Sequence, residues 1–173
     1  MAKNISTLRK LLLLLLLAVP LAAASIYLFK TLNARVGLNS SQINCILKDS
    51  RGCVWFGTPA GLYRYDGYTF KSFQCNSLDG SSLPDSYIVS MQESIDGNLW
   101  IKTSSGMCLY NPQTESFGRE MKQTFARIGI KDEPQIVFID SQKNIWTYVQ
   151  GRGVFGYNTQ QQLLYEYGYT EDV

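Results

Sequence analysis

Short runs of aliphatic, β-branched and aromatic residues alternate with polar turns along the chain after residue 30. The first clear case has apolar positions at 43–48, a polar turn with glycine at 49–52, and a second β-rich run at 54–57. Two such runs around a short turn predict a β-hairpin. No later stretch sustains the three-and-four spacing of an amphipathic helix, so the pattern predicts a meander of short strands without a long helix.

The hairpin pattern occurs three times. Its tryptophans lie 45 and 46 residues apart, a period in the range of four-stranded propeller blades. The recurring positions are Trp55, Trp100 and Trp146, then Gly61, Gly106 and Gly153, then Tyr65, Tyr110 and Tyr157. The predicted fold is all-β, a β-propeller type of about three four-stranded antiparallel blades at residues 38–73, 83–118 and 133–167.

A further strand is expected at residues 26–32, because residues 29–32 mirror the last strand of the first blade at 70–73. The first three strands of a blade do not precede it, and the third blade supplies its own fourth strand at 162–167. Propellers use about 4 to 8 blades. Three blades and a spare strand therefore predict an incomplete ring, as in the N-terminal part of a larger protein or in a truncated product.

Residues 1–24 have the parts of a secretory signal peptide. Basic residues at positions 3, 9 and 10 precede an apolar core at 11–18, and alanines at 22–24 end the segment, which predicts cleavage after Ala24 and a folded domain at 25–173. The alternative is a membrane anchor at residues 11–29, an uncharged run of about the 18 residues that a spanning helix needs. Pro20 and the strand expected at 26–32 favour cleavage.

Composition excludes several kinds of function. The formal net charge is only +2 and no basic block occurs beyond the N-terminus, so nucleic acid is not an expected partner. Histidine is absent, which removes His-based catalytic triads and His-ligated metal sites. Neither a cofactor nor a metal site is predicted. The cysteines lack metal-ligand spacing and their disulfide state stays open; they are Cys45, Cys53, Cys75 and Cys108.

The repeated residues have a structural interpretation. An aromatic side chain that recurs at one place in every blade is expected to pack between blades, although tryptophan faces also suit sugar rings. Asp49 and Asp140, which begin equivalent turns, are expected to accept backbone N–H hydrogen bonds. The copy at 94–97 comes close to the Asp-box turn of sialidases, but an arginine cluster, nucleophilic tyrosine and acid cannot be assembled around it, so the turn is interpreted as structural.

The repeat also resembles a known family, the two-component regulator propeller repeat. The resemblance rests on Asp49, Gly52, Trp55 and a Gly-Leu-x-x-Tyr-Asp run at 61–66 in the first copy, and it covers residues 26–167. The second copy departs from the pattern at Ser94 and Lys102, and the third at Lys143 and Tyr148. The resemblance implies the periplasmic sensor region of a hybrid two-component regulator, with an oligosaccharide ligand. It also implies further propeller blades and a kinase portion as partners, or else self-association.

Function is expected where the copies differ. The candidate ligand-binding residues are Lys102, Tyr148 and Arg152, and the candidate connections are residues 74–85 and 118–134. No catalytic residue is predicted. Two alternatives to a sensor stay open: a propeller glycosidase or lyase, which needs two carboxyl groups about 5 to 9.5 Å apart, and a non-functional truncated sensor.

Overall fold

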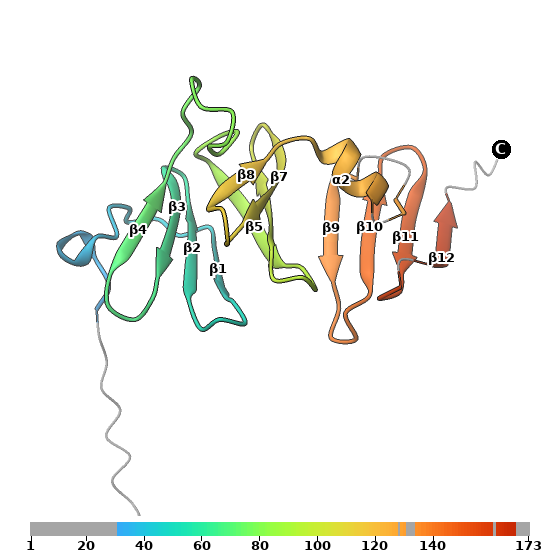
Figure 1. The fold of residues 1–173 in the computed structure, drawn as a ribbon, viewed down its shortest axis with the longest axis horizontal. Helices are drawn as coiled ribbons and strands as arrows, with labels where there is room; N and C mark the ends of the chain where they lie inside the picture. The colour runs from blue at the N-terminus through green and yellow to red at the C-terminus, as the bar shows by residue number, and fades with distance from the viewer. Residues whose placement is uncertain (1–30, 128, 131–133, 161, 169–173) are drawn as a thin grey trace, which may run out of the picture. The chain divides into compact units, whose positions relative to one another are not determined.

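The computed structural model describes residues 31–127, 129–130, 134–160 and 162–168. Apart from Thr31, all of these belong to the second of the chain's two compact units, Leu32–Val173. They form three four-stranded antiparallel sheets, each with its strands in chain order (Figure 1). The predicted signal peptide lies outside the described residues. Of the strand expected at 26–32, only Thr31 and Leu32 are described, and neither is in a strand.

The strands follow the expected runs. Sheet 1 consists of β1 (Cys45–Lys48), β2 (Val54–Thr58), β3 (Gly61–Tyr65) and β4 (Phe70–Phe73). Sheet 2 consists of β5 (Ile88–Glu93), β6 (Leu99–Thr103), β7 (Gly106–Asn111) and β8 (Ser116–Gly118). Sheet 3 consists of β9 (Ile136–Ile139), β10 (Ile145–Val149), β11 (Gly153–Tyr157) and β12 (Leu163–Gly168). The meander of short four-stranded units is therefore confirmed, and the described residues form no closed ring.

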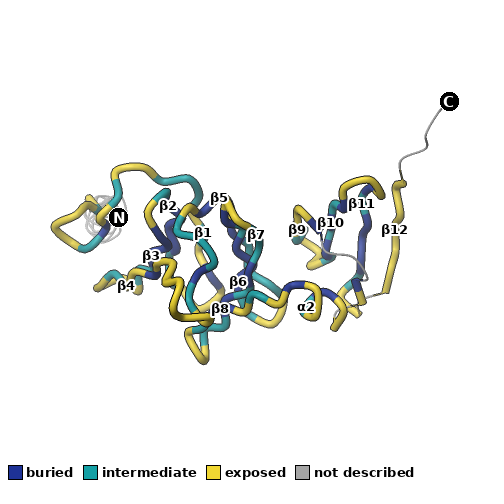
Figure 2. The backbone as a smooth tube through the Cα atoms, turned by 90° about the horizontal axis from the view of Figure 1, so that it is seen from above, coloured by how far each residue is buried: buried dark blue, intermediate teal, exposed yellow. Residues whose placement is uncertain are grey.

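The middle sheet packs against sheet 1 with one face and against sheet 3 with the other. Successive residues of its strands point to these two faces in turn. Along β6, Leu99 and Ile101 belong to the core shared with sheet 1, whereas Trp100 belongs to the core shared with sheet 3. All three are at most 4% exposed. Figure 2 shows the contrast with β12, which is exposed along its whole length. Sheets 1 and 2, and sheets 2 and 3, are thus joined through apolar cores.

Sheets 1 and 2 pack closely. The ring of Trp55 lies 5.1 Å from that of Tyr110, edge to face. A Cβ atom at Gly57 would lie 2.6 Å from a methyl carbon of Ile88, so only glycine permits this approach. The side-chain amide of Asn44 donates to the carbonyl of Ile88 at 2.7 Å, which ties the two sheets together by a direct hydrogen bond.

A short helix, α2 (Met121–Arg127), lies in the connection between sheets 2 and 3. The sequence pattern did not predict it, because seven residues are too few to establish a helical period. The helix buries Met121 and Phe125, four positions apart on one side. Phe125 stacks on Trp100 with ring centroids 5.0 Å apart, so tertiary packing stabilises this helix.

A 3-10 turn, η2 (Ala34–Val36), is the first element of the described part of the chain. Leu38, which follows it, is buried against Phe56 and Tyr63 on the face of sheet 1 that points away from sheet 2. β1 begins at Cys45, inside the blade expected at about residues 38–73, and residues 38–44 precede it. Within the described residues, no helix has both the length and the apolar character needed to cross a membrane.

Candidate functional site

The repeated aspartates hold the first hairpin turn of their sheets. One oxygen of Asp49 accepts from the backbone N–H of Cys53 at 2.8 Å, and the other accepts from the indole N–H of Trp55 at 2.9 Å. Burial would raise the pKa of Asp49, but the hydrogen bonds from Trp55, Cys53 and Arg51 outweigh it and lower that pKa. Asp140 accepts the equivalent hydrogen bonds from the backbone N–H of Asn144 and from the indole N–H of Trp146, both at 2.9 Å. The expectation that these carboxylates accept backbone hydrogen bonds is confirmed.

The recurring glycines and tyrosines lie at equivalent places. Gly61, Gly106 and Gly153 begin the third strand of each sheet with φ values of 142°, 152° and 123°, a region that favours glycine. Tyr110 and Tyr157 are buried, and Tyr65 is half-buried against Phe70. These side chains face neighbours within the protein and not a common cavity.

Trp100 differs from its counterparts. Its equivalent of Asp49 is Ser94, which is too short to reach the indole, and the buried Nε1 of Trp100 has no hydrogen-bond partner. Trp100 is 4% exposed and stacks on Phe125, whereas Trp55 is fully buried between sheets 1 and 2. Both side chains therefore pack in the core between sheets.

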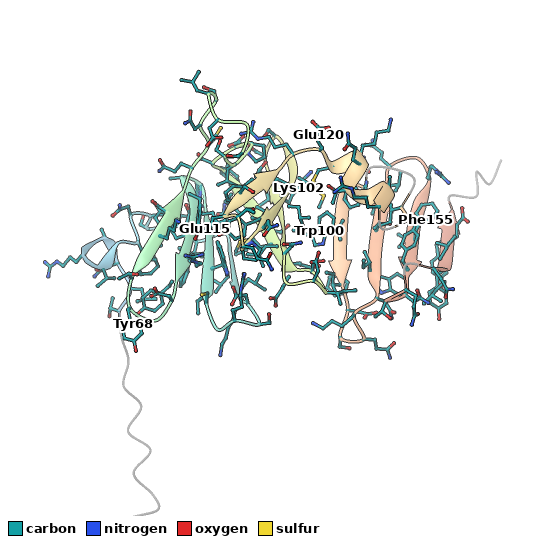
Figure 3. The ribbon with its side chains drawn as sticks, in the orientation of Figure 1. Tyr68, Trp100, Lys102, Glu115, Glu120 and Phe155 are labelled. Carbon is teal, nitrogen blue, oxygen red and sulfur yellow. The ribbon has the colours of Figure 1, made fainter. Side chains whose placement is uncertain are left out.

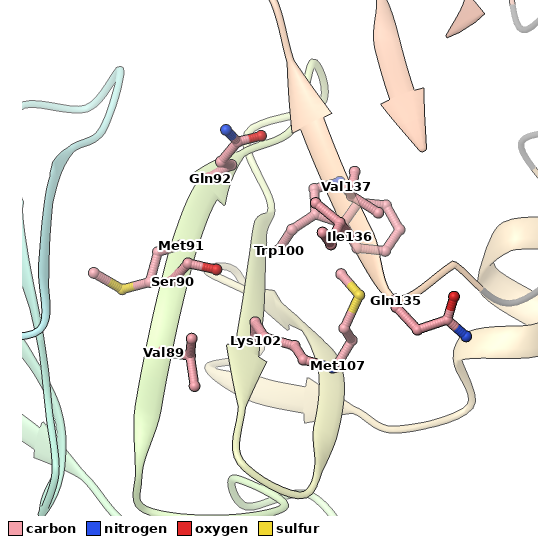
Figure 4. A pocket seen from close by; sticks show the side chains of 10 residues that line it. All are labelled: Val89, Ser90, Met91, Gln92, Trp100, Lys102, Met107, Gln135, Ile136 and Val137. Atoms are coloured by element: carbon pink, nitrogen blue, oxygen red, sulfur yellow. The ribbon is translucent and has the colours of Figure 1, made fainter. Parts of the chain in front are cut away.

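Where sheet 2 meets β9, the structure has a cavity of about 280 Å³, called here the inter-sheet cavity (Figure 4). Its walls come from β5, β6 and β7 of sheet 2 and from the start of sheet 3. Apolar side chains predominate, and Lys102 supplies the only charged group among the described lining residues. The lining residues are Val89, Ser90, Met91, Gln92, Trp100, Lys102, Met107, Gln135, Ile136 and Val137.

Two glutamines fix the edges of the inter-sheet cavity. The Oε1 atom of Gln92 accepts from the backbone N–H of Ile139 at 2.7 Å, a bond that joins sheet 2 to sheet 3. The Oε1 atom of Gln135 accepts from the backbone N–H of Gln150 at 2.7 Å. Each amide oxygen thus uses one of its two lone pairs on a backbone donor, which holds the glutamine side chain in place.

The three predicted ligand residues do not converge. Lys102 lies on β6 and lines the inter-sheet cavity (Figures 3 and 4), while Tyr148 and Arg152 are not among the lining residues. Tyr148 is on β10, and the guanidinium of Arg152, in the turn before β11, lies 5.2 Å from the ring centroid of Phe155. The glutamines and Met107 were missed, since nothing in their sequence context distinguishes them from ordinary strand residues.

The two connections proposed for ligand contact are largely engaged with the protein itself. Arg119, in the second connection, donates to the backbone carbonyls of Asp79, Ser82 and Leu83 in the first, at 2.9 to 3.2 Å. Residues 121–127 of the second connection form α2. Among the described residues, no group of three or more acidic or cysteine side chains is arranged to hold a metal ion.

Comparisons with known proteins agree with the repeat pattern. Residues 37–60 and 82–105 match the two-component regulator propeller family. The chain is 38% identical over 68 residues to Histidine kinase P4 of Formosa agariphila, a match that covers 39% of this chain and 5% of that protein. The chain thus spans a small fraction of its curated relative.

One solved structure has a similar fold. The extracellular domain of a hybrid two-component system from B. thetaiotaomicron aligns with a TM-score of 0.58 at 21% identity, covering 82% of this chain and 20% of that one. A second extracellular domain of a hybrid two-component system from the same organism aligns with a TM-score of 0.44 at 15% identity, covering 79% of this chain and 27% of that one. At 21% identity the likeness to the first structure concerns the fold alone.

Proposed function

Because residues 37–60 and 82–105 are two-component regulator propeller repeats, we propose that this chain is part of the ligand-sensing region of a hybrid two-component system and that its ligand is an oligosaccharide. The repeated Trp, Gly and Tyr positions are used for packing between and within sheets, as a scaffold requires. The inter-sheet cavity lies where this packing is incomplete. This cavity in an otherwise packed scaffold is the observation that supports a binding role.

The inter-sheet cavity has the chemistry of a small ligand subsite. Its volume of about 280 Å³ is close to the lower end of small-molecule sites, roughly 300 to 1,000 Å³. Apolar walls with a few polar groups suit a sugar ring, whose C–H faces are apolar and whose hydroxyls need partners. Lys102 is a hydrogen-bond donor, so it suits hydroxyl or ring oxygens of the ligand.

The six carboxyl groups whose pKa is shifted do not have the property of a glycosidase acid. A glycosidase acid needs a raised pKa so that it carries a proton near neutral pH. The described carboxyl groups with a shifted pKa are all shifted downward, chiefly by hydrogen bonds: Asp49, Asp66, Asp79, Asp85, Glu115 and Asp140. These groups are therefore held ionised, which suits structural turns and not proton donation.

Isothermal titration calorimetry of the chain against a panel of purified oligosaccharides tests the ligand proposal. Lys102→Ala and a cavity-filling Met107→Trp are expected to weaken binding of any oligosaccharide that the chain binds. Lys122→Ala, on the exposed side of α2, is the matched control and should bind as the parent does. If no oligosaccharide binds, or if both cavity variants bind normally, the ligand assignment or the site is wrong.

We also infer that the chain acts outside the cytoplasm, after cleavage behind Ala24. This proposal rests on the signal-like sequence at residues 1–24. Intact-mass measurement of the protein from a periplasmic fraction should give a chain that begins at Ser25. Recovery only in membranes, with residues 1–24 attached, would instead support an anchor.

A further inference from the structure

Another cavity, of about 450 Å³, lies between sheet 2 and helix α2 and is called here the α2 cavity. The turn between β5 and β6 contributes Ser94, Asp96 and Asn98 to its lining. Trp100 forms part of its wall, and α2 contributes Arg127. The volume falls within the range of small-molecule sites, roughly 300 to 1,000 Å³.

The turn between β5 and β6 keeps the backbone of its counterparts in the other sheets. In all three turns the first residue donates its N–H to the carbonyl of the residue four positions later, at 2.8 to 3.1 Å. The tryptophan follows six positions after the first residue in every case. Ser94 therefore occupies the place that Asp49 and Asp140 hold in sheets 1 and 3.

The hydrogen bonds of this turn leave one donor unmatched. In sheets 1 and 3 a single carboxylate accepts both the indole N–H and a backbone N–H of the turn. In sheet 2, Asp96 accepts from the backbone N–H of Asn98 at 3.2 Å and from its side-chain amide at 2.7 Å. The buried indole N–H of Trp100 has no hydrogen-bond partner among the described residues. A buried donor of this kind favours an acceptor at the place of the absent aspartate side chain.

Small side chains beside Trp100 leave room for the α2 cavity. In sheet 1 the two cross-strand positions beside the tryptophan hold Arg64 and Lys71, and both pair with Glu115 in the turn between β7 and β8. In sheet 2 the same two positions hold Leu109 and Gly118, and both line the α2 cavity. Long charged side chains thus occupy in sheet 1 the space that is a cavity in sheet 2.

The charged groups among the described lining residues are Arg127 and Asp96. Arg127 is a cation on α2, whereas Asp96 is an exposed carboxylate that already accepts two hydrogen bonds from Asn98. An anionic group in the α2 cavity would be attracted by Arg127 and repelled by Asp96. These opposite effects can be measured separately.

We propose that the α2 cavity binds a small molecule through a carboxylate group, which takes the place of the aspartate side chain that sheet 2 lacks and accepts the indole N–H of Trp100. Arg127 pairs with the same carboxylate. A carboxylate meets the equivalent indole in both other sheets, and charge-assisted hydrogen bonds are stronger than neutral ones. The inference does not depend on the inter-sheet cavity, because Lys102 is not among the residues that line the α2 cavity.

Nuclear magnetic resonance of the tryptophan indole N–H groups tests the proposal within one sample. Sodium acetate, added in place of sodium chloride at constant ionic strength, should shift the Trp100 indole proton downfield in a saturable way. The indoles of Trp55 and Trp146 already donate to carboxylates, so their resonances should stay in place. Ser94→Asp should abolish the Trp100 shift, because its own side chain then supplies the acceptor.

Exposed residues provide variants that leave the core intact. Arg127→Gln should weaken acetate binding about threefold, as expected for loss of an exposed ion pair, and Asp96→Asn should strengthen it because a repelling charge is removed. Lys122→Gln, on the exposed side of α2 and outside the cavity lining, is the matched control and should bind acetate as the parent does. Lys102→Ala should also leave acetate binding unchanged, which separates this site from the inter-sheet cavity.

Two further probes distinguish the source of the carboxylate. Glucuronate that binds more tightly than acetate would assign the carboxylate to an acidic sugar, whereas equal affinities would assign it to a free organic acid. Glucose has no carboxylate and should leave the Trp100 resonance in place.

Three results would overturn the proposal. The first is a Trp100 resonance that neither acetate nor glucuronate moves. The second is a shift with glucose as large as the shift with acetate. The third is equal weakening of acetate binding by Arg127→Gln and Lys122→Gln, because acetate would then respond only to the net charge of the protein.

Discussion

The carboxylate of Asp49 accepts the indole N–H of Trp55 at 2.9 Å, inside the core between sheets 1 and 2. The same pair recurs in sheet 3 between Asp140 and Trp146, also at 2.9 Å. In sheet 2 the pair is broken, because Ser94 replaces the aspartate and the buried Nε1 of Trp100 has no partner. An unsatisfied buried donor costs about 1 to 3 kcal/mol.

Ser94→Asp is therefore expected to stabilise the protein by about 1 kcal/mol, since it supplies the missing acceptor. Asp49→Ser, which recreates the sheet 2 arrangement in sheet 1, should destabilise it by about 1 to 3 kcal/mol. Urea unfolding of both variants measures the two changes. A loss of stability in Ser94→Asp would show that the Trp100 side chain cannot reach a carboxylate at position 94.

Lys143 adopts a backbone conformation that suits glycine. Its φ is 66°, and the equivalent positions in the other two turns are Gly52 and Gly97, with φ of 90° and 78°. A side chain in the left-handed region costs roughly 1 to 2 kcal/mol. Lys143→Gly should raise the free energy of unfolding by about 1 kcal/mol, and Gly97→Lys should lower it by a similar amount. Equal stability of Lys143→Gly and the parent would contradict the strain.

Stability should fall in acid through Asp49. Its pKa is lowered in the folded protein, so the unfolded chain takes up the proton first as the pH falls. The stabilisation is complete above the ordinary carboxyl pKa of about 4 and is lost as the pH falls through the lower folded value. Asp49→Asn should flatten this part of the curve of unfolding free energy against pH. An unchanged curve would show that Asp49 is not the group responsible.

Trp100→Ala should destabilise the fold much more than Tyr87→Ala. Trp100 is 4% exposed and Tyr87 is 43% exposed. Removing a buried large aromatic side chain costs about 3 to 5 kcal/mol, comparable to the whole stability of a marginal domain. Thermal unfolding followed by circular dichroism compares the two variants. Similar melting temperatures would mean that Trp100 is not a core residue in solution.

The cysteines should differ in reactivity. Cys108 is fully buried, and burial raises the pKa of its thiol to about 12, whereas Cys75 is exposed. Because the thiolate is the reactive form, iodoacetamide at mildly alkaline pH should label Cys75 in the folded protein and Cys108 only after denaturation. Peptide mass mapping distinguishes the sites. Early labelling of Cys108 would mean that the core around it opens readily.

Local patterns were enough to predict the four-stranded units of the three sheets, their turns and the role of Asp49 and Asp140, because hairpins are formed by residues close together in sequence. The substitution at position 94 is also visible in the sequence. Its consequence is not, since an orphaned indole N–H depends on how deeply Trp100 is buried. Helix α2 was missed for a similar reason, because its stability comes from Phe125 stacking on Trp100 and not from its own seven residues.

The order of the residues is enough to show a meander of three repeated β-units, because the alternation within a strand and the spacing of the tryptophans can both be read along the chain. What lies between the units depends on how the sheets pack in three dimensions. Lys102 lines the inter-sheet cavity, whereas Tyr148 and Arg152 do not, because the set of residues that line a cavity depends on how two sheets pack together. The different environments of Trp55, Trp100 and Trp146 likewise appear only when the three sheets are compared, because the burial of a residue depends on what packs against it.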